Sequence, residues 1–230
     1  MAGGQSGQNI AAGAFGVIAL FAFIVGFIFY AAWGLLPHLA KPTGGTIIVS
    51  NSCVTPLLPT IVNDQKFSAA IDQYITKYAS GSPFRGMGAD FVAAGKAHGI
   101  NPAWEVNIAR KESVFGTMGW AVQHANNAFG RTAGDGQPSI TSPTGKKWYK
   151  YDSFKDSISN QAEYLKRRFV DKGLTTFDSI TPVYCPPSEC DTPAYIKQME
   201  QWVGEVVGLA GDSLQCQDTG AGNAPPKTTP

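Results

Sequence analysis

The sequence has little charge, and no Asp, Glu, Lys or Arg precedes Lys41. Only 15% of the 230 residues are charged, and the formal net charge is +1. This balance gives no strongly basic surface, so we expect no nucleic acid among the partners. The hydrophobic share of 43% is enough for one folded domain of ordinary size. The composition therefore excludes a largely disordered chain and argues against a nucleic-acid-binding class.

The uncharged region contains one long apolar run, residues 10–37. A helix needs about 20 such residues to cross the core of a bilayer. The run is longer than the core of a signal peptide, and no basic region precedes it. We therefore predict a retained transmembrane helix, with Tyr30 and Trp33 near one interface and the lipid bilayer as a partner. A buried core helix and a cleaved signal are the alternatives.

Cysteine is also scarce, with four residues, all outside the apolar run. Cys53 and Cys216 bracket the soluble part, and Cys185 and Cys190 enclose the short loop CPPSEC. This pattern suits two disulfides formed in an oxidising compartment. Three pairings are possible, and we favour Cys185–Cys190 with Cys53–Cys216. Four unpaired thiols are the alternative.

The three histidines, His38, His98 and His124, have no zinc-ligand spacing with the cysteines. We expect no metal and no cofactor. For the orientation, Lys41 after the apolar run weakly favours a cytoplasmic C-terminal side, whereas disulfides favour the opposite side. We give the cysteines more weight, and predict a single-pass protein of the cell membrane with an extracytoplasmic soluble domain.

The chain divides by composition into five segments. Residues 1–9 form a polar tail, 10–37 the transmembrane helix, and 38–64 a stalk rich in Pro and Gly. Residues 65–216 form the folded domain, and 217–230 a tail with almost nothing to bury, which we predict to be disordered.

The pattern within the domain is helical. Apolar residues recur at helix spacing from Phe67 to Tyr78, an Ala-rich helix follows over 91–98, and Asn101-Pro102 starts a third. Further starts are a capping box at Ser153 and Asp156 and the pair Thr192-Pro193. Residues 116–152 are instead rich in Gly, Ser, Thr and Pro. We expect a mostly α, globular domain with a small irregular or β-hairpin lobe.

Glu112 lies near the end of the third predicted helix, in the stretch ARKESVFG. It follows Ile108 by four residues and Ala109 by three, so it shares their face, which a helix normally buries. Burial and the partial negative charge of the helix C-terminus both favour a protonated carboxyl group. General-acid cleavage of a glycosidic bond requires such a group. An exposed helix-end glutamate is the alternative.

Three segments around Glu112 carry a family resemblance. They read SPFRGMGADFVAAGKAHGINPAWEVNIARKESVFGT, NNAFG and WYKYDSFKDSISNQAEYL, in that order. Together they resemble the lysozyme-like glucosaminidases of glycoside hydrolase family 73, and the wider set of lysozyme-like domains that cleave peptidoglycan, over about residues 82–202. The resemblance implies a lysozyme-like fold and cleavage of a β-1,4 bond in peptidoglycan glycan strands, with Glu112 as the acid.

Other site residues follow from the same resemblance. Asn127, Phe129 and Gly130 match the segment that packs beside the acid and borders the sugar groove. Tyr151 begins the stretch that leads into a helix, and Tyr184 and Tyr195 fall where the family has tyrosines at the site. Aromatic rings suit sugars because they cover the C–H-rich faces of pyranoses. Core or rim packing is the alternative role for each tyrosine.

The chain departs from the family in its second carboxylate. Between Glu112 and Asp152 the only acidic residue is Asp135, in a Gly-flanked turn. Inverting glycosidases need a base about 6.5–9.5 Å from the acid, and retaining ones a nucleophile about 5–5.5 Å away. Asp135 is the candidate, with a solvated turn residue as its alternative. Otherwise the N-acetyl group of the substrate attacks, or Glu112 serves as acid and then base, as in lytic transglycosylases.

These observations predict a membrane-anchored peptidoglycan hydrolase of the N-acetylglucosaminidase type that remodels the wall locally. One alternative is a lytic transglycosylase of an envelope-spanning secretion, conjugation or phage apparatus, whose components would then be partners. Another is a non-catalytic wall-binding module of such an assembly, which the missing second carboxylate favours. Hydrolysis of N-glycans shares the fold analogy but has no sequence feature of its own.

Overall fold

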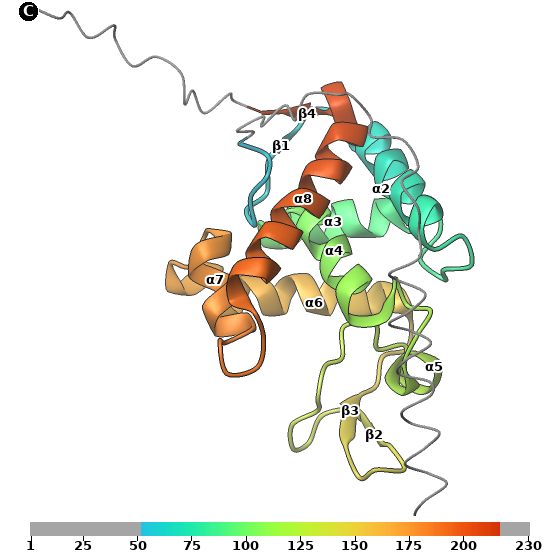
Figure 1. Cartoon of the computed structure of the whole chain (residues 1–230). Helices are drawn as coiled ribbons and strands as arrows, with labels where there is room; N and C mark the ends of the chain where they lie inside the picture. Colours follow the sequence, from blue (N-terminus) through green and yellow to red (C-terminus); the bar gives the residue numbers. More distant parts are fainter. Residues whose placement is uncertain (1–51, 217–230) are drawn as a thin grey trace, which may run out of the picture. The chain divides into compact units, whose positions relative to one another are not determined.

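A computed structural model describes residues 52–216 (Figure 1). This part is mostly helical, as expected, with seven α-helices and two small two-stranded sheets. The predicted tail 1–9, transmembrane helix 10–37 and C-terminal tail 217–230 lie outside the described residues. Within residues 52–216, no helix is both long enough and apolar enough to span a membrane.

The five helices expected from the sequence all form, although α3 begins at Gly88 rather than at residue 91. Asn101 accepts a hydrogen bond from the Ala103 amide, and Ser153 accepts one from the Asp156 amide, so both act as N-caps. A third N-cap, Asp191, accepts from the amide of Ala194. The five helices of this group are α2 (Asp64–Tyr78), α3 (Gly88–His98), α4 (Pro102–Ser113), α6 (Phe154–Arg168) and α8 (Thr192–Ala210).

Two short helices have no counterpart in the predicted pattern. They are α5 (Trp120–Ala125) and α7 (Phe177–Tyr184), which contains Pro182. Proline inside a helix lacks one amide donor, and this usually indicates a helix boundary. The α7 helix nevertheless begins with a capping box between Thr176 and Ser179.

Residues 116–152 form a lobe that contains α5 and a β-hairpin, and we call it the hairpin lobe. Strand β2 (Ser139–Thr141) pairs antiparallel with β3 (Lys147–Tyr149). The lobe lies below the C-terminal end of α4 in Figure 1. The β-hairpin alternative for this region is therefore confirmed.

The two ends of the described chain are joined. Strand β1 (Thr60–Ile61) pairs antiparallel with β4 (Leu214–Gln215), and a disulfide links Cys53 to Cys216. The other disulfide links Cys185 to Cys190, so the pairing favoured from the sequence is present. Residues 52–63, predicted to belong to the stalk, are thus joined to the end of the domain.

Helix α4 forms the centre of the core. Trp104 packs against Phe177 of α7, Asn107 accepts a hydrogen bond from Tyr74 of α2, and α3 and α8 also contact the helix. Residues 102–109 are all buried, whichever face they lie on. A central helix of this kind holds its last turn, which contains Glu112, on a rigid support.

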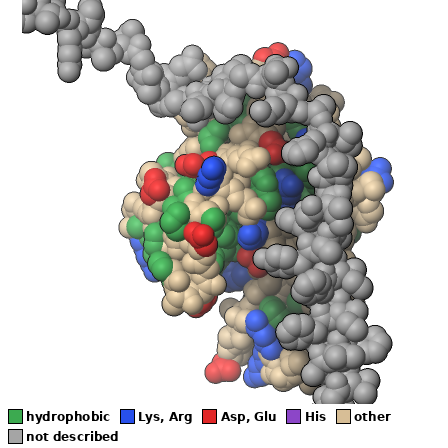
Figure 2. All heavy atoms as spheres, in the orientation of Figure 1, with side chains coloured by type: hydrophobic (Ala, Val, Ile, Leu, Met, Phe, Trp, Pro, Cys, Tyr) green, Lys and Arg blue, Asp and Glu red, His purple; other side chains and the backbone are tan. Residues whose placement is uncertain are grey.

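Close approach of α2 and α3 depends on Gly88. A Cβ atom there would lie 2.1 Å from the Ser68 carbonyl oxygen, so no larger residue fits without moving the helices apart. On the face in Figure 2, acidic and basic side chains are interspersed with hydrophobic ones.

Candidate functional site

Glu112 lies in the last turn of α4, at the edge of the core. Ile108 and Ala109 on the same face are buried, as expected, but the Glu112 side chain is exposed. The prediction that Glu112 is buried is therefore wrong. The last turn is buried on the side of Ser113, whereas Glu112 borders an open cleft, so shared periodicity does not imply shared burial here.

The chain reverses direction directly after Glu112 in a strained turn. Val114 and Phe115 both have left-handed backbone conformations, with φ of 50° and 56°. This conformation costs L-residues about 1–2 kcal/mol each and is especially rare for a β-branched valine. Such strain persists only where the surroundings fix it, and it gathers at functional sites.

Buried contacts fix this turn. Phe115 is fully buried against Tyr74, and its amide donates to the Ala109 carbonyl oxygen at 3.0 Å. The Ser82 hydroxyl donates to the Phe115 carbonyl oxygen at 2.6 Å, and the Gly116 amide donates to Ser113 Oγ at 2.9 Å. The position of the carboxyl group thus rests on the core rather than on a free loop.

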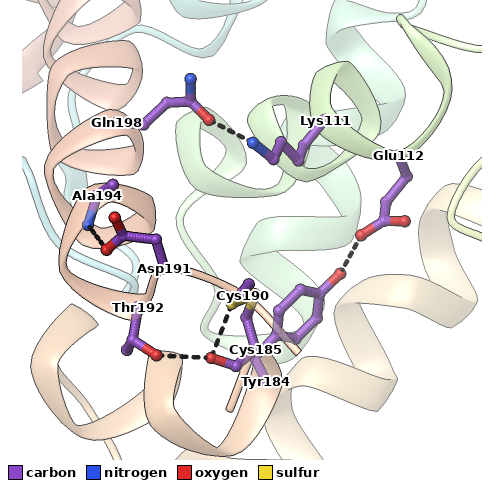
Figure 3. The surroundings of a disulfide bond; sticks show 9 residues. All are labelled: Lys111, Glu112, Tyr184, Cys185, Cys190, Asp191, Thr192, Ala194 and Gln198. Atoms are coloured by element: carbon purple, nitrogen blue, oxygen red, sulfur yellow. Dashed lines mark hydrogen bonds between the residues drawn. A yellow bond between two sulfur atoms is a disulfide. The ribbon is translucent and has the colours of Figure 1, made fainter. Parts of the chain in front are cut away.

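One carboxyl oxygen of Glu112 faces the end of α7. The Tyr184 hydroxyl donates a hydrogen bond to Glu112 Oε1 at 2.8 Å (Figure 3). Burial, followed by the neighbouring Glu112 carboxylate, raises the pKa of the Tyr184 phenol well above its usual range. Because its pKa is raised, the Tyr184 phenol stays protonated at neutral pH and remains a hydrogen-bond donor.

A second phenol lies near the first. The Tyr195 ring on α8 is 6.0 Å from the Tyr184 ring, and its hydroxyl is buried without a hydrogen-bond partner among residues 52–216. Burial, and then Glu112, raises the pKa of Tyr195 as well. The structure thus brings both predicted tyrosines near Glu112, and of the two only Tyr184 is hydrogen-bonded to it within residues 52–216.

The other carboxyl oxygen faces the hairpin lobe. A methyl group added at Gly130 would lie 3.6 Å from Glu112 Oε2 and 4.0 Å from the Trp148 ring. Gly130 has a φ of 65°, which also favours glycine. The acid therefore lies between Tyr184 on one side and Gly130 on the other.

Asn127, Phe129 and Tyr151 support the lobe from within. The Asn127 amide nitrogen donates to the carbonyl oxygens of Arg131 and Tyr149, and its oxygen accepts from the Arg131 amide. All three side chains are buried, and burial raises the pKa of Tyr151 to about 12. Their geometry suits holding Gly130 in place better than touching a sugar.

Asp135 is exposed in a turn in which the Gln137 amide donates to the Gly134 carbonyl oxygen. No hydrogen bond or ion pair joins it to Glu112 within residues 52–216. The structure thus does not bring these two carboxylates into contact.

A cleft of about 480 Å³ opens beside Glu112 on the Tyr184 side. The residues that line it come from three segments: Lys111 and Glu112 from α4, Tyr184, Cys185, Glu189 and Cys190 from the end of α7 and its loop, and Asp191, Ala194, Tyr195 and Gln198 from the start of α8. A hollow of about 600 Å³ between α2 and α3 shares none of these residues.

The cleft also contains two acidic residues, Glu189 and Asp191, which lie outside the segment 112–152 where the family resemblance places a second carboxylate. Asp191 is engaged in capping α8. The Glu189 side chain has no hydrogen bond or ion pair within residues 52–216. Its position inside the CPPSEC loop, next to a predicted disulfide and a predicted site tyrosine, is the signal that points to it.

A different glutamate, Glu105, is fully buried in the first turn of α4. Neither of its oxygens has a hydrogen-bond partner of normal geometry among the described residues, and burial raises the pKa of Glu105 well above its usual range. An interaction with the Ala162 backbone lowers the pKa of Glu105, but by less than burial raises it. Ser157 and Gln161 of α6 are also buried, each with an unpaired oxygen.

No family model and no curated protein matches the sequence. Among solved structures, the fold is similar to a crystal structure of S. aureus autolysin E in complex with the muropeptide NAM-L-Ala-D-iGlu. The TM-score is 0.42 with 12% sequence identity, over 72% of this chain and 72% of that chain. This likeness is too distant to assign any residue a role.

Proposed function

We propose that the protein is a glycosidase that cleaves the β-1,4-linked glycan strands of peptidoglycan, with Glu112 as general acid. The observation that carries the proposal is the placement of this carboxyl group on a rigid helix end, between a phenol donor and a glycine, beside a cleft. The three segments that resemble glycoside hydrolase family 73 supply the substrate class.

The two carboxyl oxygens have different surroundings, and this supports a direction for proton transfer. Oε1 accepts from Tyr184, so a proton on Glu112 resides on Oε2, the oxygen on the Gly130 side. Transfer of that proton to the leaving glycosidic oxygen turns the carboxyl group into a carboxylate. The Tyr184 hydrogen bond favours this charged form, so it strengthens as the reaction proceeds.

A second catalytic group is not needed for the first step. In one route, the acetamido group of the substrate attacks the anomeric carbon and completes bond cleavage. In the other, a hydroxyl group of the substrate sugar attacks while Glu112 acts as base, and an anhydro sugar forms. The lack of contact between Glu112 and another carboxylate within residues 52–216 favours these single-acid routes. Glu189 is the residue through which a two-carboxylate mechanism would operate.

The test compares the full chain with its Glu112→Gln variant on purified sacculi, with products identified by mass spectrometry. Loss of a positioned general acid lowers the rate about 10²–10⁴-fold. Glu163→Gln, on the exposed face of α6, is the matched control and keeps the wild-type rate. Reducing ends or anhydro ends then separate hydrolysis from transglycosylation. Glycan binding without new ends favours a wall-binding module instead.

For localisation, we propose that residues 10–37 anchor the domain to the cell membrane on its wall side. Residues 38–52 then form the tether, which at full extension spans about 50 Å. A tether of this length limits the enzyme to nearby wall, which suits local remodelling for an envelope-spanning assembly. Membrane fractionation of the full chain, compared with a chain lacking residues 10–37, tests the anchor: equal membrane association of both contradicts it.

A further inference from the structure

The loop after α7 is closed by the Cys185–Cys190 disulfide and forms one wall of the cleft (Figure 3). Cys185 directly follows Tyr184, the residue whose hydroxyl contacts Glu112. Its amide donates to the Thr181 carbonyl oxygen at 2.8 Å and so ends the helix. Any movement of Cys185 therefore moves the residue that holds the acid.

The disulfide also ties this helix end to the next helix. The Thr192 hydroxyl, at the start of α8, donates to the Cys185 carbonyl oxygen at 3.0 Å. The amides of Glu189 and Cys190 both donate to the Pro186 carbonyl oxygen and fold the loop between the two cysteines. The start of α8 thus helps to hold Cys185, and with it the preceding residue Tyr184, in place.

Helix α7 has little stability of its own. It has eight residues, and Pro182 removes one backbone hydrogen bond in its last turn. The disulfide closes a separation of only 5 residues, whereas Cys53–Cys216 closes 163. Short loops constrain the unfolded chain less, so the consequences of opening Cys185–Cys190 are mainly local.

We infer that the Cys185–Cys190 disulfide is a positioning element of the site, which holds the Tyr184 phenol against Glu112 and makes this contact sensitive to dithiol reductants. Both cysteines are partly exposed, whereas Cys53 is 1% exposed. A thiolate of the dithiol attacks one sulfur and displaces the other as a thiolate. The second thiol of the reductant then resolves the mixed disulfide, so two electrons pass to the protein, leaving two cysteine thiols and an oxidised reductant.

The contact can be measured without a substrate, by NMR of the full chain with tyrosine labelled at the ring carbon that bears oxygen. Tyr184→Phe assigns the Tyr184 signal. In the oxidised protein, Glu112→Gln shifts this signal because the phenol loses its carboxylate partner. In the Cys185→Ser/Cys190→Ser variant the same Glu112 change leaves the signal unmoved. Ser188→Ala, within the same loop, keeps the oxidised behaviour. A shift of equal size with the disulfide open overturns the inference.

The rate of glycan cleavage gives a second measurement, which rests on the proposed function. Opening the disulfide lowers kcat about 10-fold, the effect of losing one hydrogen bond to a charged group. In the Tyr184→Phe background the same opening has no further effect, whereas a merely structural bridge lowers the rate in both backgrounds. Inactivity of every variant, including wild type, removes the proposed function but leaves the NMR result to decide the inference.

If the serine variant does not fold, wild-type protein is treated with dithiothreitol and monitored by the same NMR signal. We expect the Tyr184 signal to move on reduction and to return on reoxidation, while the thermal unfolding transition is retained. A signal unaffected by reduction of this bridge, with reduction verified by mass spectrometry, contradicts the inference.

Discussion

The first and last turns of α4 hold two glutamates in opposite surroundings. Glu105 is fully buried and has no hydrogen-bond partner of normal geometry in the described part of the chain, whereas Glu112, two turns later, is exposed and accepts from a phenol. Burial alone therefore does not distinguish a candidate general acid. Glu112 differs from Glu105 in access: its side chain is exposed beside a cleft, Oε1 accepts from Tyr184, and Oε2 lies on the Gly130 side.

The largest expected effect is on the free energy of unfolding, which depends on pH through Glu105. Burial raises the pKa of Glu105 above that of the unfolded chain, about 4.3. Above pH 4.3 the unfolded chain releases this proton while the folded chain keeps it, so the free energy of unfolding falls as pH rises. In the wild type, Glu105 lowers the free energy of unfolding by up to about 1.4 kcal/mol per pH unit, and Glu105→Gln abolishes this contribution. Urea unfolding of the full chain between pH 5 and 8 measures it. An unchanged pH slope contradicts a buried neutral Glu105.

Next in size is the effect of crowding the free oxygen. Gly130→Ala places a methyl group 3.6 Å from Glu112 Oε2 and adds strain at a φ of 65°. We expect a loss of about 1–3 kcal/mol. The loss appears in transition-state binding if the loop that contains Gly130 moves toward Glu112, and in the free energy of unfolding if the loop stays in place under strain. Steady-state kinetics and thermal unfolding separate the two. Gly136→Ala has a similar φ and no neighbour within 4 Å, so it controls for strain alone.

The two tyrosines provide a matched pair. Tyr184→Phe removes the donor to Glu112, and we expect a rate loss of about 10-fold, from a charge-assisted hydrogen bond of roughly 1.5 kcal/mol. Tyr195→Phe removes a buried hydroxyl that has no partner within residues 52–216, so stability is unchanged or higher. Equal losses of rate in both variants would mean that the Tyr184 contact has no special role.

The smallest effect is expected in the turn after the acid. Val114 is 39% exposed and left-handed. Asn tolerates this conformation better than Val, so Val114→Asn is expected to stabilise the fold by up to about 1 kcal/mol. Differential scanning calorimetry gives the change. A destabilised variant would show that apolar contacts of Val114 outweigh its backbone strain.

Much of the helical fold follows from local chemistry. Side-chain caps at Asn101, Ser153 and Asp191 depend on neighbours a few residues away, so the sequence predicts these helices well. Helix α7 is missed because Pro182 suggests a helix boundary, whereas the helix packs against α8 and against Trp104 of α4. Such contacts join distant parts of the chain and leave no local pattern.

The site is only partly predictable for the same reason. The apolar residues of α4 are not restricted to one face, and this indicates a central helix whose polar members, including Glu105, are buried as well. The exposure of Glu112 instead depends on the cleft that α7, its loop and α8 leave open beside it. Glu189 reaches the cleft from 77 residues further along the chain, so no motif around the acid contains it.

The most direct test of the central claim is the rate of glycan cleavage by full-length Glu112→Gln and Glu105→Gln, both verified as folded at the assay pH. We predict that Glu112→Gln loses at least about 10²-fold and that Glu105→Gln retains most of the wild-type rate. Undiminished cleavage by Glu112→Gln would contradict its assignment as the acid.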